Sequence, residues 1–270
     1  HPVQSWSITD IVANSSNVGA ITIAGKLGKQ RLNSYLRAFG VGARTGLGFP
    51  GESSGLLADP SKWYSTDMAT IPIGQGGVSV TAVQMLAAYN SVANGGLYVA
   101  PKLVRAVLDD RGRRKATPPS TTRRVISATS ARQLTAMLDE VVRVGTGKAA
   151  AVNGYTVAGK TGTARKPLPG GTGYKTGAYM SSFAGFVPAE KPAFSIMVIL
   201  DEPTPIFGGL VAAPVFAELA GYALREFRIP PPPAIKAPAV PDTTAEKAQP
   251  VGDGDAGTTT TLVSVPRPTP

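Results

Sequence analysis

Tyr155-Thr156-Val157-Ala158-Gly159-Lys160-Thr161-Gly162-Thr163-Ala164 carries more information about this chain than any other segment. Its aromatic and β-branched start predicts a strand. Lys160, Thr161 and Gly162 then place a cation, a hydroxyl and a position without a side chain in a row. A glycine lets a ligand backbone approach the strand closely, and ammonium and hydroxyl groups suit a carboxylate. The segment therefore predicts a strand that lines an anion-binding site.

A K-T-G triplet alone is a weak signal, but other elements accompany it. Ser15-Ser16-Asn17 supplies an S-x-N element upstream, and Gly74-Gln75-Gly76-Gly77 lies between the two. K-T-G and S-x-N, together with S-x-x-K, are the motifs of penicillin-binding proteins and class A β-lactamases. From about Trp6 to about Phe227 the chain resembles the transpeptidase domain of class B penicillin-binding proteins, specifically the cell-division branch. Gly145-Thr146-Gly147, just ahead of K-T-G, is also typical of that family.

The resemblance implies a fold and a division of the chain. The fold is α/β of the α+β type, the penicillin-binding/β-lactamase-like transpeptidase fold, in which helices flank an antiparallel sheet. We expect its N-terminal part to be missing, so that residues 1–229 form the C-terminal part of the domain. Residues 230–270 are rich in Pro, Thr and Ala and contain no aromatic residue. Such a segment cannot offset its ordering entropy by burial, so it is predicted to be a disordered tail.

The resemblance also implies an activity. The family comprises serine D,D-transpeptidases that cross-link peptidoglycan stem peptides by acyl transfer and bind β-lactams covalently. In such a site, Ser15 relays a proton to the leaving group, and Asn17 orients the lysine of S-x-x-K and the substrate amide. Lys160 tunes that proton relay. From the residues alone, Ser15 could instead simply cap a helix.

The substrate-binding residues follow from the same motif. By resemblance, Thr161 and Thr163 hold the carboxylate of the substrate or β-lactam beside Gly162, and the Thr163 N–H forms half of the oxyanion hole. No metal and no cofactor is expected. The expected partners are peptidoglycan stem peptides, β-lactams and, for the full-length parent, divisome proteins.

The S-x-x-K element is absent from the sequence, because no serine has a lysine three residues later. Covalent catalysis needs an activated nucleophile beside a base, so the chain alone is expected to be inactive. The simplest interpretation is a C-terminal fragment whose nucleophile lies upstream of His1. Two alternatives stay open: a non-catalytic cell-wall-binding pseudoenzyme, or a relative of the β-lactamases and D,D-carboxypeptidases. The sequence preceding His1 would discriminate between them.

Composition excludes several other classes of protein. The chain has no Cys and a single His, which argues against thiol catalysis, a Ser-His-Asp triad and a His-ligated zinc site. No apolar run approaches the ~18 residues of a transmembrane helix. The resemblance places the parent at the extracytoplasmic face of the bacterial cell membrane, with an anchor that is not in this chain.

The chain is strongly basic, with a net charge of +10 and a pI near 9.9. The cations are dispersed apart from two clusters, Arg111–Lys115 and Arg123–Arg124. No aromatic run accompanies them, so nucleic acid is not an expected partner. We predict a solvated surface loop here, with attraction to anionic wall polymers or lipid headgroups as the functional alternative.

Hydrophobic periodicity predicts the order of the elements. Helices are predicted over residues 17–27 and 29–39, from Ser79 or Thr81 to 93, from Ser130 onward, and over 212–227. Two of them carry an inward apolar stripe: Leu32, Tyr35, Leu36 and Phe39 in the second, and Val215, Phe216, Leu219 and Leu224 in the last. Main strands are predicted over 155–165, 179–187 and 193–200, and short strands over 103–108 and 123–126. The segment 166–178 is predicted to be a mobile loop. The third main strand is apolar on both faces, which favours a strand in the middle of a sheet covered by helices.

Overall fold

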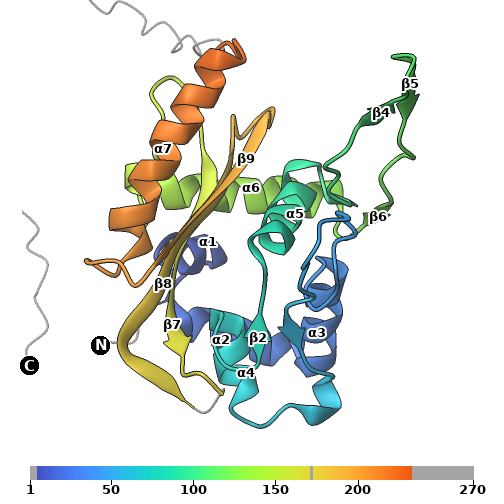
Figure 1. Ribbon diagram of the computed structural model, residues 1–270. Helices are drawn as coiled ribbons and strands as arrows, with labels where there is room; N and C mark the ends of the chain where they lie inside the picture. Colours follow the sequence, from blue (N-terminus) through green and yellow to red (C-terminus); the bar gives the residue numbers. More distant parts are fainter. Residues whose placement is uncertain (1–4, 171–172, 233–270) are drawn as a thin grey trace, which may run out of the picture. The chain divides into compact units, whose positions relative to one another are not determined.

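The computed structural model describes residues 5–170 and 173–232 of the chain. The predicted tail lies outside the described residues except for Pro230, Pro231 and Pro232, so its disorder and the boundary at 229 stay predictions. The described part is a mixed α/β structure in which helices surround a three-stranded antiparallel sheet (Figure 1). The predicted fold class is therefore confirmed.

Seven helices occur in the described residues: α1 (Ile8–Ala13), α2 (Asn17–Leu27), α3 (Lys29–Ala38), α4 (Asp67–Thr70), α5 (Ala82–Ala93), α6 (Ala128–Arg143) and α7 (Gly208–Glu226). Side-chain caps explain where several begin. The Thr81 side chain accepts the Gln84 N–H and Gln84 reaches back, a capping box at the start of α5. Ser16 is the N-cap of α2, where its side chain accepts the Gly19 N–H. Gly28, at a φ of 82°, separates α2 from α3.

The strands form one central sheet and three small ladders. They are β1 (Leu56–Leu57), β2 (Val78–Ser79), β3 (Leu97–Val99), β4 (Ala106–Leu108), β5 (Arg114–Ala116), β6 (Thr122–Arg124), β7 (Ala158–Pro167), β8 (Tyr174–Val187) and β9 (Phe194–Asp201). The central sheet has the order β7-β8-β9, and each pair is antiparallel. The other ladders pair β1 with β2, β3 with β6 and β4 with β5.

The two faces of the central sheet pack against different helices. Helix α7 covers one face, where Phe183 and Val198 meet Phe216 in the largest apolar cluster. The rings of Phe183 and Phe216 lie 4.7 Å apart in a tilted arrangement. Helices α5 and α6 cover the other face, where Phe186 and Ala158 form a second cluster. Strand β9 contacts α7 on one face and α5 on the other, as its apolar pattern predicts, although Ile199 is 40% exposed. The predicted place in the middle of the sheet is wrong for the described residues, because β9 lies at an edge of the three-stranded sheet.

Several sequence predictions need correction. Tyr155, Thr156 and Val157 do not belong to β7; Tyr155 instead forms an isolated bridge with Val152. Helix α6 is capped by Ser127, three residues before the predicted start. Most of the predicted loop 166–178 belongs to β7 and β8.

The side of α7 that faces the sheet also differs from the prediction. Val215 and Leu219 were expected to face inward, but they are 38% and 48% exposed. Phe216 and Leu224 are buried as predicted, and small residues, Ala212, Ala213 and Ala220, complete the buried face. Alanine lets the helix approach the sheet closely, so small residues took the place that hydrophobicity alone assigned to the larger ones.

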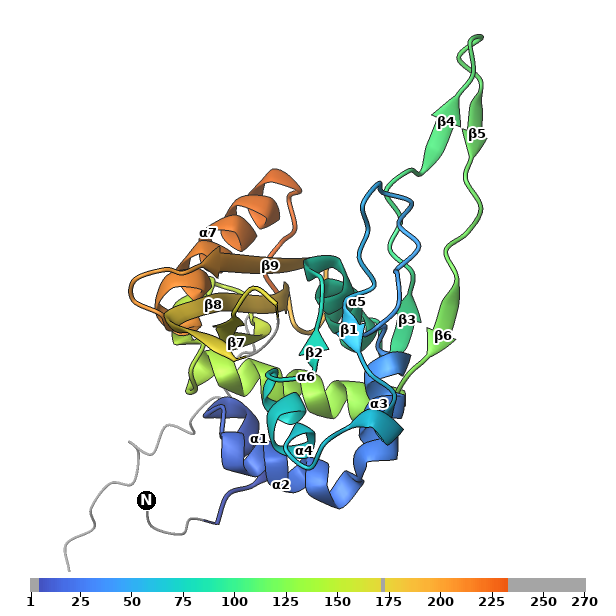
Figure 2. The same ribbon diagram turned by 60° about the horizontal axis from the view of Figure 1, so that its bottom comes forward.

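The two basic clusters are exposed, as predicted, but only part of them lies in a loop: Arg111 and Arg113 belong to the turn between β4 and β5. Arg114 and Lys115 belong to β5, and Arg123 and Arg124 belong to β6. Arg123 donates to the Ala38 carbonyl at 3.0 and 2.8 Å and stacks 3.6 Å from the Tyr98 ring centroid. The β3–β6 ladder is thereby attached to the end of α3, and the β4–β5 hairpin extends beyond it, away from the helices (Figure 2).

Candidate active site

The K-T-G residues lie on β7, which pairs with β8 along one side and has a free edge among the described residues. Side chains alternate between the two faces of a strand. The register pairs Thr161 with Phe183 and Lys160 with Ala184. Thr161 and Thr163 therefore project on the face covered by α7, and Lys160 projects on the face covered by α5 and α6.

Lys160 nevertheless reaches round the free edge. Its Nζ lies 3.1 Å from both the carbonyl oxygen and the Oγ1 of Thr161. The Thr161 carbonyl must therefore point away from β8, and by the alternation of an antiparallel ladder the Thr163 N–H points to the same edge. The free edge thus presents an ammonium group and an available backbone donor side by side.

The Lys160 side chain is half-buried. Burial disfavours the charged form of a lysine, and it lowers the pKa of Lys160 to about 8. Near neutral pH the group is still mostly protonated, but it can release its proton far more readily than a surface lysine. Such a poised ammonium suits both carboxylate binding and a part in proton transfer.

The start of α7 fixes Thr163 from the other side of the strand. The Gly208 N–H donates to Thr163 Oγ1 at 3.3 Å, which leaves the hydroxyl proton of Thr163 free to be donated elsewhere. A Cβ at Gly208 would overlap the carbonyl oxygens of Ser182 and Gly162. The absence of side chains at the start of α7 therefore allows this helix to sit directly on the K-T-G strand.

Thr146 joins the K-T-G strand to the S-x-N element. Its Oγ1 lies 2.9 Å from Thr161 Oγ1, and its backbone N–H donates to the Ala13 carbonyl at 3.1 Å. Ala13 is the last residue of α1, two positions before Ser15. The G-T-G segment is typical of the family, but its sequence pattern does not indicate a role for Thr146. In the structure, Thr146 links the two predicted motifs.

Ser15 and Asn17 occupy the turn between α1 and α2. Ser15 has a φ of 56°, in the left-handed region that a non-glycine residue adopts rarely. The capping role belongs to Ser16, whose hydroxyl accepts the Gly19 N–H at 3.2 Å. The Ser15 side chain is exposed and has no capping duty, and Asn17 begins α2 with an exposed side chain. The turn thus leaves both predicted side chains available to a ligand.

The G-Q-G-G segment approaches the far end of the same hairpin. The Gly76 N–H donates to the Tyr174 hydroxyl at 2.9 Å, and Arg165 lies 5.2 Å from the Tyr174 ring centroid. Gly76 has a φ of 70°, and a Cβ there would overlap Thr70 Oγ1. The loop before α5 is therefore held against the start of β8, where it adjoins the strand pair that carries K-T-G.

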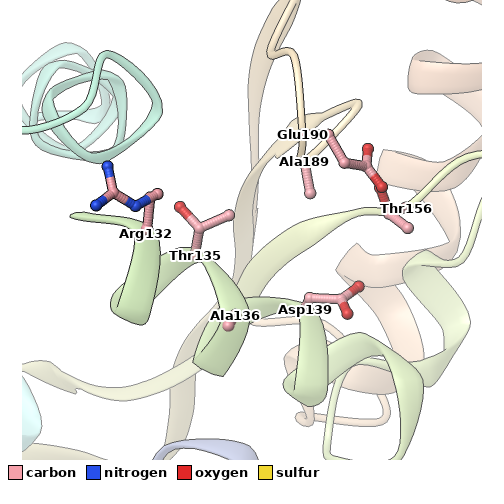
Figure 3. Close-up of a pocket in the computed structure, with 7 residues that line it drawn as sticks. All are labelled: Arg132, Thr135, Ala136, Asp139, Thr156, Ala189 and Glu190. Atoms are coloured by element: carbon pink, nitrogen blue, oxygen red, sulfur yellow. The ribbon is translucent and has the colours of Figure 1, made fainter. Parts of the chain in front are cut away.

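A separate pocket of about 200 Å³ lies beside α6, away from these residues (Figure 3). Its lining consists of Arg132, Thr135, Ala136, Asp139, Thr156, Ala189 and Glu190. Burial, and then the charge of Glu190, raises the pKa of Asp139. None of the predicted site residues lines this pocket, so it is distinct from the candidate active site.

Within residues 5–170 and 173–232, no group of three or more His, Cys, Asp or Glu is arranged to hold a metal ion. Across the same ranges, no helix combines the length and apolar character needed to cross a membrane.

The chain matches known proteins over most of its length. Residues 2–221 match the family described as penicillin binding protein transpeptidase domain. The penicillin-binding protein PbpB of Mycobacterium tuberculosis is 38% identical over 240 residues, which are 85% of this chain and 35% of that protein. The probable peptidoglycan D,D-transpeptidase PbpC of Pseudomonas aeruginosa is 37% identical over 239 residues, 87% of this chain and 40% of that protein.

The comparison with solved structures agrees with these sequence matches. The crystal structure of penicillin-binding protein 3 from Mycobacterium tuberculosis in complex with aztreonam superposes with a TM-score of 0.80 at 38% identity, covering 86% of this chain and 54% of that one. The chain thus spans only about a third to two fifths of the curated relatives it matches. By sequence and by structure, the chain belongs to the penicillin-binding protein transpeptidase family, as a class B member.

Proposed function

We propose that this chain supplies the S-x-N and K-T-G parts of the active site of a peptidoglycan D,D-transpeptidase. The observation that carries the proposal is the free edge of β7, where Lys160, Thr161 and the Thr163 N–H converge and are tied through Thr146 to the turn of Ser15. The D,D-transpeptidase relative at 37% identity supports it. The nucleophilic serine would come from residues outside these 270.

Substrate binding follows from the chemistry of the free edge. The terminal carboxylate of a D-alanyl-D-alanine stem peptide, or the carboxylate of a β-lactam, would accept hydrogen bonds from the Thr161 and Thr163 hydroxyls. The Lys160 ammonium would add a charge-assisted contact. Thr163 is suited to this role because its oxygen already accepts from Gly208 and its proton is free. Gly162 lets the substrate backbone lie along the strand.

Acyl transfer would combine these groups with the nucleophilic serine and its base from outside these 270 residues. The serine hydroxyl attacks the carbonyl carbon of the penultimate D-alanine, and its proton passes to a neighbouring base. The Thr163 N–H stabilises the resulting oxyanion, an interaction worth about 100- to 1000-fold in rate. As the intermediate collapses, the C–N bond breaks and Ser15 gives its hydroxyl proton to the departing amine while it takes up the proton that the base had accepted. Lys160 keeps the Ser15 hydroxyl polarised, and Asn17 positions the substrate amide.

The second half of the reaction distinguishes cross-linking from inhibition by a β-lactam. An amine of a neighbouring stem peptide attacks the serine ester and completes the cross-link, whereas a β-lactam leaves a slowly hydrolysed ester. We propose that the complete protein acts on stem peptides at the extracytoplasmic face of the cell membrane and meets divisome proteins there. The aztreonam-bound relative supports the β-lactam part of this proposal.

The test uses the protein expressed from its complete reading frame. Lys160→Ala and Ser15→Ala should each slow acylation by a fluorescent penicillin at least 100-fold, while circular dichroism shows unchanged folding. Lys191→Ala and Ser34→Ala are matched controls, because both residues are exposed and neither belongs to the site. Wild-type acylation in the Lys160 or Ser15 variant would remove that residue from the site.

A further inference from the structure

The β4–β5 hairpin and its flanks, residues 103–117, form a feature that the proposed activity does not use; we call this segment the basic arm. It extends beyond the β3–β6 ladder as a two-stranded ribbon (Figures 1 and 2). Its cations are Arg105, Arg111, Arg113, Arg114 and Lys115, and its carboxylates are Asp109 and Asp110. No helix covers either face of the ribbon in the described residues, so both faces meet solvent.

The arm has an uncompensated positive charge. Asp109 is neutralised internally, because its Oδ2 lies 2.7 Å from Arg113 Nε and its Oδ1 accepts the N–H groups of Arg111 and Arg113. Of the two carboxylates, only Asp110 is left to balance the four cations other than Arg113. A partner that binds here must therefore be acidic.

The arm also exposes aliphatic side chains. Their exposed fractions are 63% for Leu103, 50% for Val104, 57% for Val107 and 66% for Leu108. The register sets Val107 opposite Lys115 and Leu108 opposite Arg114, so each face of the ribbon carries an aliphatic group beside a cation. A partner that offers only anionic groups would leave these aliphatic groups in water. The surface therefore fits a partner whose acidic and aliphatic groups alternate.

One edge of the ribbon is open to further pairing. Thr117 N–H donates to the Arg105 carbonyl at 3.1 Å, and Asp109 N–H donates to the Arg113 carbonyl at 3.1 Å. By the alternation of an antiparallel ladder, the N–H and C=O groups of Ala106 and Leu108 point outward from β4. The opposite edge carries Arg114 and Ala116 and runs into Pro118 and Pro119, which blunt it. On β4, Ala106–Leu108 has neither a charge nor a proline.

The base of the arm is fastened, so the ribbon is formed before any partner binds. Lys102 Nζ donates to the carbonyl oxygens of Thr117 and Pro118. Thr117 Oγ1 donates to the Val104 carbonyl at 2.7 Å. These contacts close the hairpin at the end nearest the body of the protein, and a pre-formed edge reduces the entropy lost on binding.

We propose that the basic arm docks an extended acidic–aliphatic segment of a partner protein, which adds to β4 as a third strand. The backbone groups of Ala106 and Leu108 would pair with the segment, and its acidic side chains would meet Arg105 and the cations of β5. An anionic bilayer fits less well, because the carboxylate of Asp110, unpaired among the described residues, lies at the turn and a bilayer offers no backbone groups for pairing.

The test uses a fluorescent, end-capped nonapeptide of alternating Glu and Val, and a second nonapeptide of alternating Lys and Val. The decisive variants are Ala106→Pro and Ala116→Pro. These residues are cross-strand partners, and both direct their N–H groups outward, so each proline removes an edge donor without breaking the hairpin's own ladder. Fluorescence anisotropy with the full chain measures affinity, and hydrogen exchange at residues 106–108 reports pairing.

We expect the Glu–Val peptide to bind at least ten times more tightly than the Lys–Val peptide and to slow exchange at residues 106–108. Ala106→Pro should weaken binding at least tenfold, whereas Ala116→Pro should change it less than twofold. Equal losses in the two variants, or no preference for the acidic peptide, would overturn the proposal. Binding to phosphatidylglycerol vesicles without binding to the peptide would also overturn it, and would make the arm a lipid contact.

Discussion

Lys160→Met should change the stability of the protein in a way that depends on pH. Burial lowers the pKa of Lys160 from 10.5 to about 8. Between those values the unfolded chain holds more protons than the folded one, so this group makes the free energy of unfolding rise with pH. The cost of burying the ammonium is thus fully present below about pH 8 and disappears above about pH 10.5.

The magnitude follows from the pKa difference. The two pKa values of Lys160 differ by about 2.5, so the cost of burying its ammonium is about 3 kcal/mol at 1.36 kcal/mol for each pKa unit. Roughly 2 kcal/mol of this cost of burying the ammonium is lost between pH 7 and pH 9.5. Because the side chain is only half-buried and solvent screens its charge, we expect to observe about half to two thirds of this change. The stability of Lys160→Met relative to wild type should therefore be about 1–1.5 kcal/mol higher at pH 7 than at pH 9.5.

Urea denaturation at the two pH values measures this difference directly. All other titrating groups are common to both proteins and cancel in the comparison. Lys191→Met, at an exposed position between β8 and β9, is the control for the loss of a lysine away from the site. An equal effect of Lys160→Met at both pH values would mean that the ammonium is not desolvated, and the account of a poised lysine would be wrong.

Two further substitutions test the contacts around the K-T-G strand. Thr146→Val removes the hydroxyl that lies 2.9 Å from Thr161 Oγ1, and the loss of this hydrogen bond should cost about 1–2 kcal/mol. In the protein from the complete reading frame, we therefore expect roughly tenfold slower acylation by penicillin. The control Thr135→Val, whose hydroxyl bonds within α6, should not slow acylation. Gly208→Ala places a Cβ against the Ser182 and Gly162 carbonyl oxygens and should lower the free energy of unfolding by about 1–3 kcal/mol in urea denaturation. The control Gly25→Ala, with no atom near its added Cβ, should be neutral or stabilising. Equal effects of the two substitutions would contradict the close packing of α7 on the K-T-G strand.

Local signals predicted much of the fold. Helix α2 begins at Asn17 and ends at Leu27 as expected, because Ser16 caps its start and Gly28 ends it. Helix α5 ends at Ala93 and is capped by Thr81, one of the two expected caps. Caps and glycines act within a few residues, so a sequence pattern can register them.

Other features depend on contacts between distant segments. The predicted stripe on α7 was right for Phe216 and Leu224 but wrong for Val215 and Leu219. A helical period does not say how closely the sheet approaches, and the close approach selects Ala212, Ala213 and Ala220. Tyr35 was expected on the inner face of α3 but is 46% exposed, while Asn33 is buried and donates to the Ala58 carbonyl. Polar partners that lie 25 residues away leave no periodic signal.

The same distinction applies to the candidate site. The motifs named Ser15, Asn17, Lys160, Thr161, Gly162 and Thr163, and their catalytic roles stay predictions. Thr146 and Gly208 were not assigned roles, because each acts through a hydrogen bond to a residue of the K-T-G strand that lies 15 or 45 positions away. The only available signal was the G-T-G segment itself.

Intact-mass spectrometry after incubation with penicillin tests the central claim most directly. The 270-residue chain and the protein from the complete reading frame are treated in parallel, and any adduct is mapped by peptide sequencing. We predict one acyl adduct on the complete protein, on a serine upstream of His1, and none on the 270-residue chain. An adduct on any serine or threonine of these 270 residues, or no adduct on the complete protein, would contradict the account.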